Sequence, residues 1–85
     1  MATVAGFATA LPADFTKIAN NQVDGALLKI AANAVPVQDG VLPVLDSVET
    51  NGNTFHMYFS YPGTGLRCDA YVTKEGKAGR HGCVL

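Results

Sequence analysis

The chain contains two cysteines, Cys68 and Cys83, and they fall opposite each other if the chain folds back at Glu75-Gly76. A two-residue turn at that point pairs residues 66–73 with residues 78–85 as antiparallel strands. Cysteines that are cross-strand neighbours lie close enough to form a disulfide. A bridge that closes a loop of this length contributes about 3 kcal/mol, a large part of the stability of a small domain. The sequence therefore predicts a C-terminal hairpin fastened by a disulfide.

A zinc site is the alternative for these cysteines. His81 lies two residues before Cys83, on the same face of the predicted strand, and Cys68 lies opposite. Cysteine and histidine are the usual zinc ligands, but a structural site needs four of them, and only His56 or Asp69 is near enough to add one. We therefore expect the disulfide, with no metal and no cofactor.

Size and charge exclude several classes of protein. The chain has 85 residues, which predicts a single domain over residues 1–85 with a core that is marginal without a covalent link. Hydrophobic residues make up 48% and charged residues 15%, the opposite of a disordered chain. The net charge is −1 and the basic residues form no run, so we expect no nucleic-acid partner. No apolar stretch approaches the roughly 20 residues of a membrane helix, so we expect no membrane insertion.

The cysteine pair also predicts a compartment. Disulfides persist in oxidising environments, so the expected location is periplasmic or secreted. Residues 1–11 are apolar and rich in alanine, but they lack the positively charged start of a signal peptide. We interpret them as the start of a mature chain, and the remnant of a removed leader or anchor is the alternative.

A helix is predicted over residues 13–35. Pro12-Ala13-Asp14 resembles a helix start, because proline suits the first turn and aspartate suits the positive end of the helix dipole. Pro36 ends it. Asn20-Asn21 and Gly25 weaken its middle, where the helix bends or splits in two. The apolar residues at helical spacing are Phe15, Ile18, Ala19, Val23, Ala26, Leu27, Ile30, Ala31 and Ala34.

Four strands are predicted after the helix, over residues 44–50, 54–61, 66–73 and 78–85. Asn51-Gly52 between the first two is the strongest short hairpin signal, because both residues tolerate the positive φ of a type I′ turn. That turn pairs three sets of residues: Val48 with Phe55, Ser47 with His56, and Asp46 with Met57. The helix buries its stripe only on the sheet face that carries Phe55, Met57, Phe59, Leu66 and Val72. The expected fold class is α+β, with one N-terminal amphipathic helix packed on a four-stranded antiparallel meander.

No catalytic grouping emerges from this register. Ser47 and His56 face each other, but Asp46 points to the other face and does not orient the imidazole, while Glu49 lies two residues along from Ser47. An open sheet face also lacks preorganised donors for an oxyanion. Asp46 itself is expected on the apolar face beside Met57, at the sheet margin or with a partner, because a buried unpaired carboxylate is costly. We expect no catalytic residue and no enzyme.

The outward face of the sheet is the predicted binding surface. It combines aromatic and arginine side chains, the types enriched in protein-binding hot spots. Tyr71 opposite Arg80 also suggests a cation–π contact. An ordinary solvated sheet face is the alternative. The candidate binding residues are His56, Tyr58, Arg67, Tyr71 and Arg80.

Two resemblances bear on function. Leu45-Asp46-Ser47-Val48, Gly52-Asn53-Thr54 and Tyr58 resemble a pattern in small exported bacterial α+β domains of unknown function, over roughly residues 27–61. The order of helix, antiparallel meander and C-terminal disulfide also resembles the globular head of a type IV pilin. After Pro62 the last strands and the cysteine spacing depart from the first pattern.

Three functions are compatible with these features. The leading hypothesis is an exported, non-enzymatic domain that binds another protein, as an inhibitor, an immunity factor or an envelope accessory component. The second is a pilin-like or surface-assembly subunit, whose partner is a further copy of the chain. The third is a small enzyme that uses His56 or His81, which requires a concave pocket that one helix on four strands hardly provides.

Overall fold

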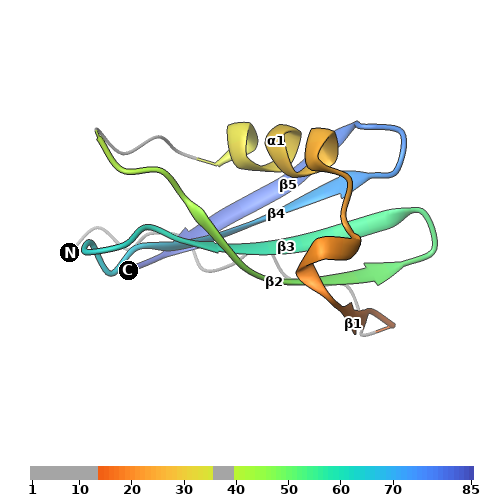
Figure 1. Ribbon diagram of the computed structural model, residues 1–85, viewed down its shortest axis with the longest axis horizontal. Coiled ribbons are helices and arrows are strands. Elements are labelled where there is room, and N and C mark those ends of the chain that lie inside the picture. Colours follow the sequence, from red (N-terminus) through yellow and green to blue (C-terminus); the bar gives the residue numbers. More distant parts are fainter. Residues whose placement is uncertain (1–13, 36–39) are drawn as a thin grey trace.

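Five antiparallel strands form the body of the described structure, in a sheet that follows the order of the chain (Figure 1). The computed structural model describes residues 14–35 and 40–85. One 3-10 turn, η1 (Asn20–Gln22), and one helix, α1 (Gly25–Ala34), lie between the first two strands. The strands are β1 (Thr16–Ile18), β2 (Val44–Asn51), β3 (Thr54–Ser60), β4 (Arg67–Thr73) and β5 (Ala78–Val84).

The expected α+β fold, with a helix over residues 13–35 on four strands, is wrong. Within residues 14–35 only Gly25–Ala34 is α-helical. Of the stripe residues before it, Ile18 lies in β1, Ala19 and Val23 flank η1, and Phe15 lies just before β1. Thr16–Ile18 forms β1, which pairs with Val48–Thr50 of β2 and adds a fifth strand at the edge of the sheet. The described part of the chain is therefore mainly an antiparallel sheet with one short helix. Pro12-Ala13, the expected helix start, lies outside the described residues.

The helix begins late because Asp24 caps it. The Asp24 carboxylate accepts a hydrogen bond from the backbone N–H of Ala26 at 2.8 Å, which satisfies one of the free donors of the first turn. Upstream, the side-chain oxygen of Gln22 accepts from the Ala19 N–H at 2.9 Å and closes η1. Asparagine and aspartate side chains bond to nearby backbone and so favour caps and turns over helix interiors. This local chemistry outweighs the helical spacing of the apolar residues.

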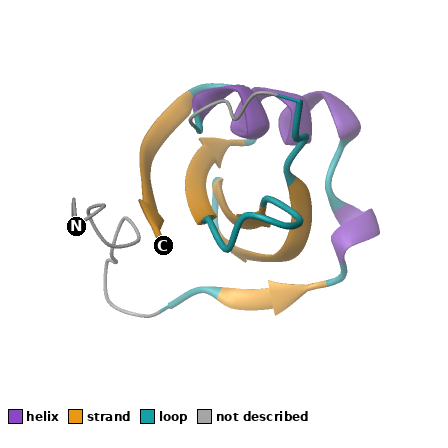
Figure 2. Ribbon diagram, turned by 90° about the vertical axis from the view of Figure 1, so that its left-hand side faces the viewer, coloured by secondary structure: helices purple, strands orange, loops and turns teal. Residues whose placement is uncertain are grey.

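The core lies between α1 and one face of the sheet. Viewed end-on, the sheet is strongly curled, and α1 packs over β4 and β5 (Figure 2). Ala31 of α1 and Val35 directly after it are buried against this side. We call this side of the sheet the core face, and the opposite side the His56 face. The buried strand residues of the core face are Val48, Phe55, Met57, Phe59, Cys68, Ala70, Val72 and Cys83.

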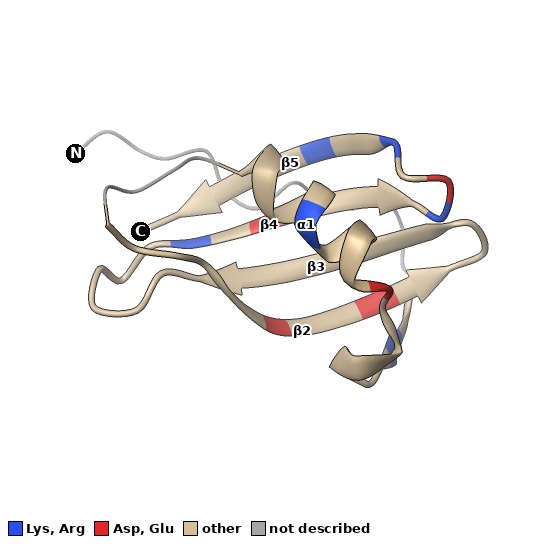
Figure 3. Cartoon of the chain, turned by 45° about the horizontal axis from the view of Figure 1, so that its top comes forward, with Lys and Arg blue, Asp and Glu red and all other residues tan. Residues whose placement is uncertain are grey.

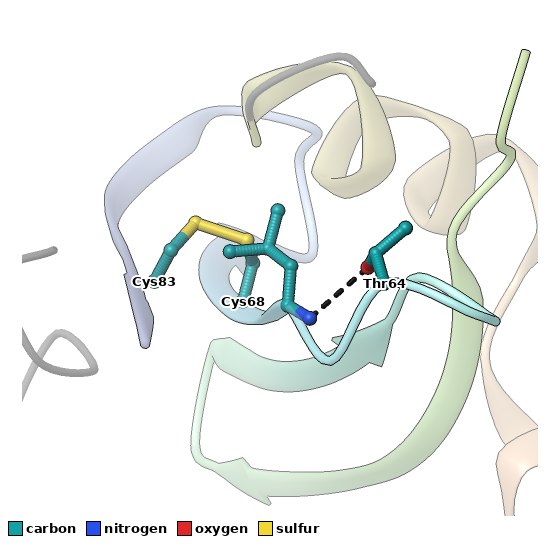
Figure 4. Close-up of a disulfide and its surroundings, with 4 residues drawn as sticks. Thr64, Cys68 and Cys83 are labelled. Carbon is teal, nitrogen blue, oxygen red and sulfur yellow. Dashed lines mark hydrogen bonds between the residues drawn. A yellow bond between two sulfur atoms is a disulfide. The ribbon is translucent and has the colours of Figure 1, made fainter. Parts of the chain in front are cut away.

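The predicted disulfide between Cys68 and Cys83 is confirmed, and it joins β4 to β5 (Figure 4). Both sulfurs are bonded to each other, so neither cysteine is a zinc ligand. Their Cα atoms are 4.0 Å apart, which is the spacing of a non-hydrogen-bonded pair and not of the wider hydrogen-bonded pair that a two-residue turn implies. Nearby, the backbone N–H of Leu66 donates to the Thr64 hydroxyl at 3.0 Å and shapes the turn that leads into β4.

The turn between β4 and β5 explains that spacing. The Thr73 N–H donates to the Lys77 carbonyl at 2.9 Å, so the loop holds three residues instead of two, with Gly76 at a φ of 93°. This moves the pairing near the turn by one residue, and Val72 pairs with Ala78. A β-bulge opposite Tyr71 then restores the register before the cysteines. The glycine-weakened strand β5 thus keeps the predicted Cys68–Cys83 pair.

The described part of the chain contains no helix of the length and hydrophobicity that crossing a bilayer requires.

Candidate functional site

The turn between β2 and β3 decides which side chains meet on the His56 face. Asn51 pairs with Thr54, so the two turn residues are Gly52 and Asn53, and Gly52 has a φ of 55°. Glycine in the first central position with positive φ is the signature of a type II′ turn, not of the expected type I′. The register moves by one residue, and the expected Ser47–His56 pair is wrong. Glu49 stands opposite His56 instead.

His56 is held between two carboxylates. Its Nδ1 lies 2.8 Å from Oε2 of Glu49 on β2, and its Nε2 lies 2.5 Å from Oδ2 of Asp69 on β4. Glu49 is the direct cross-strand neighbour of His56, and Asp69 lies two residues before Tyr71, the neighbour of His56 on the other side. The site is enclosed: His56 is 4% exposed and Asp69 is fully buried.

Both hydrogen bonds need a proton, which fixes the proton count of the group. An ionised carboxylate only accepts, and a neutral imidazole has a single N–H. A neutral histidine and two ionised carboxylates have a single N–H to share between the two hydrogen bonds. Both bonds can therefore form only if the group holds one additional proton. The group is either an imidazolium between two carboxylates or a neutral imidazole beside one protonated carboxyl. Hydrogen bonds to charged groups are the stronger kind, and burial strengthens them further.

Aromatic side chains enclose the imidazole. The Tyr71 ring stacks on it, with centroids 4.0 Å apart and planes 6° apart. Phe15, just before β1, meets both rings edge-on, with centroids 5.9 Å away. The Tyr58 hydroxyl donates to Oε2 of Glu49 at 3.0 Å. We call the set of Glu49, His56, Tyr58, Asp69 and Tyr71 the His56 network.

The tyrosines of this network keep their protons. Burial, and then the hydrogen bond to Glu49, raise the pKa of Tyr58 far above its ordinary value. Burial, and then the charge of Asp69, raise the pKa of Tyr71 as well, while Arg80 acts in the opposite sense. Both phenols are therefore neutral donors over the physiological range. The Tyr58 proton adds a hydrogen bond to Glu49, which His56 also contacts.

A carboxylate that orients a histidine is part of many nucleophilic enzymes, but this geometry lacks the remaining part. In such a site one ring nitrogen faces the orienting acid and the other faces a nucleophile. Here both nitrogens of His56 face carboxylates. Both cysteines are committed to the disulfide. Among the described residues, no cluster of three or more ligand side chains has metal-binding geometry. The arrangement holds three strands together and leaves no ring nitrogen for proton transfer.

The five predicted binding residues divide into two groups. His56 and Tyr71 are buried inside the network and Tyr58 is half-buried at its edge. Arg67 and Arg80 are exposed. The Arg80 guanidinium lies 5.9 Å from the centroid of the Tyr71 ring, so the expected cation–π pair is present.

Asp46 does not lie on the apolar face as expected. A β-bulge between Leu45 and Ser47 turns it to the His56 face, where it is exposed. There its Oδ1 accepts a hydrogen bond from the Ser60 hydroxyl at 2.9 Å. The extra residue of the bulge thus relieves the burial cost that the uninterrupted register implied.

Sequence reasoning missed Glu49 and Asp69 as partners of His56. The signal for Glu49 was present, because a type II′ turn at Gly52 places an acid directly opposite the histidine, a favourable cross-strand pair. Asp69 was considered only as a possible zinc ligand, because its diagonal contact with His56 depends on the register between β3 and β4, which no short turn fixes.

Comparison of the chain with protein-family models, with curated proteins and with solved structures finds no match in any of the three. The resemblances to exported bacterial domains and to pilin heads stay predictions.

Proposed function

We propose that this chain is an exported domain, periplasmic or secreted, that binds another protein and performs no reaction of its own. The observation that carries the proposal is the β4–β5 hairpin. Its strands are joined covalently by Cys68–Cys83, while Arg67, Lys77 and Arg80 stand exposed along it. A surface that is already rigid loses little conformational entropy on binding, and arginine beside an aromatic ring is a typical anchor of an interface.

The distribution of charge indicates the kind of partner. Four of the six cations, Arg67, Lys74, Lys77 and Arg80, lie exposed on β4, β5 and their turn, where Glu75 is the one exposed acid among the described residues. The acids Asp46 and Glu49 lie on β2 (Figure 3). A surface of one sign steers a partner of the opposite sign and fixes its orientation. The proposed partner therefore presents an acidic surface to the hairpin. The disulfide supports the exported location, because such bonds persist in oxidising compartments.

Capture of the partner tests this proposal. Immobilised wild-type protein is exposed to the extracytoplasmic fraction of the source cells, beside the double variant Arg67→Ala/Arg80→Ala. The matched control is Lys17→Ala, which removes an exposed cation from β1 at the far edge of the sheet. We expect wild type and Lys17→Ala to retain the same acidic protein and the double variant to lose it, with an unchanged circular dichroism spectrum. Equal capture by all three, or no captured protein, contradicts the proposal.

A further inference from the structure

A pocket of about 260 Å³ opens beside the turn between β4 and β5. It exists because of the bulge in β5, where two residues stand opposite Tyr71. One of them is Gly79, and a Cβ atom there would lie 3.4 Å from Cβ of Tyr71, so the missing side chain leaves the space beside the tyrosine unfilled. The other residues that line the pocket are Thr54, Tyr71, Val72, Thr73, Lys77 and Arg80.

The rim of the pocket is positively charged. Lys77 and Arg80 both line it, and within the described residues neither has a carboxylate within 4 Å. The neighbouring charges on the turn are engaged elsewhere. The Glu75 carboxylate accepts from the Asn53 amide at 2.5 Å, and the Lys74 ammonium lies 5.6 Å from the centroid of the Phe55 ring.

The wall of the pocket is fixed in place. One side of the Tyr71 ring stacks on His56, and the Arg80 guanidinium lies 5.9 Å from its centroid. His56 is itself held by two carboxylates. Tyr71 is therefore already ordered before any ligand arrives, which lowers the entropy cost of binding against it. Val72, Thr54 and Thr73 also line the pocket, and its lining is mostly apolar.

We infer that this pocket binds a small organic carboxylate with a planar apolar body. The carboxylate meets Arg80, whose planar guanidinium suits two parallel hydrogen bonds, and Lys77 adds a second positive charge. The body lies beside Tyr71 and over Gly79. The volume is slightly below the roughly 300–1,000 Å³ typical of drug-sized ligands, which favours a compact molecule. This ligand site is additional to the proposed protein-binding role.

Nuclear magnetic resonance titration tests the site with three probes. Labelled protein is titrated with benzoate, with benzamide as its neutral counterpart, and with acetate, which lacks the planar body. We expect benzoate to shift the backbone amides of Thr73, Lys77 and Gly79 in a saturable way. Benzamide and acetate should each bind about tenfold more weakly, since one loses the charge-assisted hydrogen bonds and the other the apolar contact.

Variants assign the effect to the cations. Arg80→Gln should weaken benzoate binding by about tenfold or more, Lys77→Gln by a smaller factor, and the control Lys17→Gln not at all. Both Arg80 and Lys77 are exposed, so the spectra of the variants should keep the dispersion of the folded protein. Failure of benzoate to shift these amides overturns the inference. Equal binding of benzamide, or equal weakening by Lys17→Gln, also overturns it. Because Arg67 lies outside the pocket, Arg67→Ala reduces partner capture only, which separates this site from the protein-binding proposal.

Discussion

The core face and the His56 face of the sheet are both buried near their centres, but they are built from opposite chemistry. Met57 and Phe59 on the core face pack under α1 with other apolar side chains, and any residue of similar size and polarity would serve. One residue away along β3, His56 contacts the carboxylates of Glu49 and Asp69, and it reaches both only in the observed pairing of β2, β3 and β4. Burial of apolar area is tolerant of small changes, whereas a buried polar network fails when one member is missing. The two faces therefore contribute differently: the core face supplies stability, and the His56 face specifies how the strands align.

The largest loss of stability is expected from truncation of the core face. Phe59 is 1% exposed, so Phe59→Ala removes a fully buried ring and leaves a cavity. We expect the free energy of unfolding to fall by about 4 kcal/mol, measured by urea denaturation. Val44→Ala is the matched control, because Val44 lies at an exposed position on the other face and should change stability by less than about 0.5 kcal/mol. Similar losses at both positions would contradict this account of the core.

The His56 network should give the sharpest contrast with that result. His56→Leu removes the group that both carboxylates bond to, so we expect a loss of about 3 kcal/mol. Replacing all three members, as Glu49→Met/His56→Leu/Asp69→Val, leaves no buried charge behind and should recover at least about 1 kcal/mol relative to the single variant.

The triple variant shows whether the network mainly stabilises the fold or mainly fixes the alignment of the strands. If the network mainly aligns the strands, the triple variant is stable but shows line broadening or a second set of resonances from β2 and β3. The core face alone then has to oppose a register slip. A triple variant less stable than His56→Leu would mean that the network is itself a main source of stability. The distinction between the two faces would then fail.

The disulfide supports the core face from its far edge. It spans 15 residues of sequence, so loss of the bond in Cys68→Ala/Cys83→Ala should cost about 3 kcal/mol. Denaturation of the variant beside the oxidised wild type measures the difference. The mass of the intact wild type should also rise by two hydrogens on reduction. A wild type whose mass and stability are unchanged by reductant would contradict the covalent link.

The sequence predicted the elements that a local pattern of side chains defines. It did not predict the elements that form only by pairing with another strand. Alternation along β3 and β4 was sufficient to assign Phe55, Met57 and Phe59 to the core face, and the four predicted strands begin and end within one residue of β2 to β5. The helical spacing of Phe15 and Ile18 misled, because an edge strand of three residues is too short to alternate and is formed by its pairing with β2.

The candidate site was harder to predict than the fold. A single residue of difference in the turn at Gly52 exchanges Ser47 for Glu49 opposite His56, and so turns an apparent open patch into a buried network. The bulges at Leu45–Ser47 and opposite Tyr71 add two more register changes that no local signal in the sequence placed. The first moves Asp46 off the core face, and the second keeps Arg80 near the Tyr71 ring, as expected, although the turn differs.

The smallest effect compares one tyrosine from each face. Tyr58 belongs to the His56 network, and Tyr61 belongs to the core cluster. At neutral pH, Tyr58→Phe should cost about 1 kcal/mol, because Glu49 loses a hydrogen-bond donor.

Burial raises the pKa of both phenols above the ordinary value of about 10. The folded protein therefore holds these protons more tightly than the unfolded chain does. Their contribution to stability is complete below about pH 10 and is lost as the pH rises further. Urea denaturation between neutral and strongly alkaline pH should accordingly show stability falling above about pH 10, with a shallower fall in either Phe variant. Because Tyr58 is also bonded to Glu49, Tyr58→Phe should flatten the fall more than Tyr61→Phe, and equal slopes would show that burial alone governs both tyrosines.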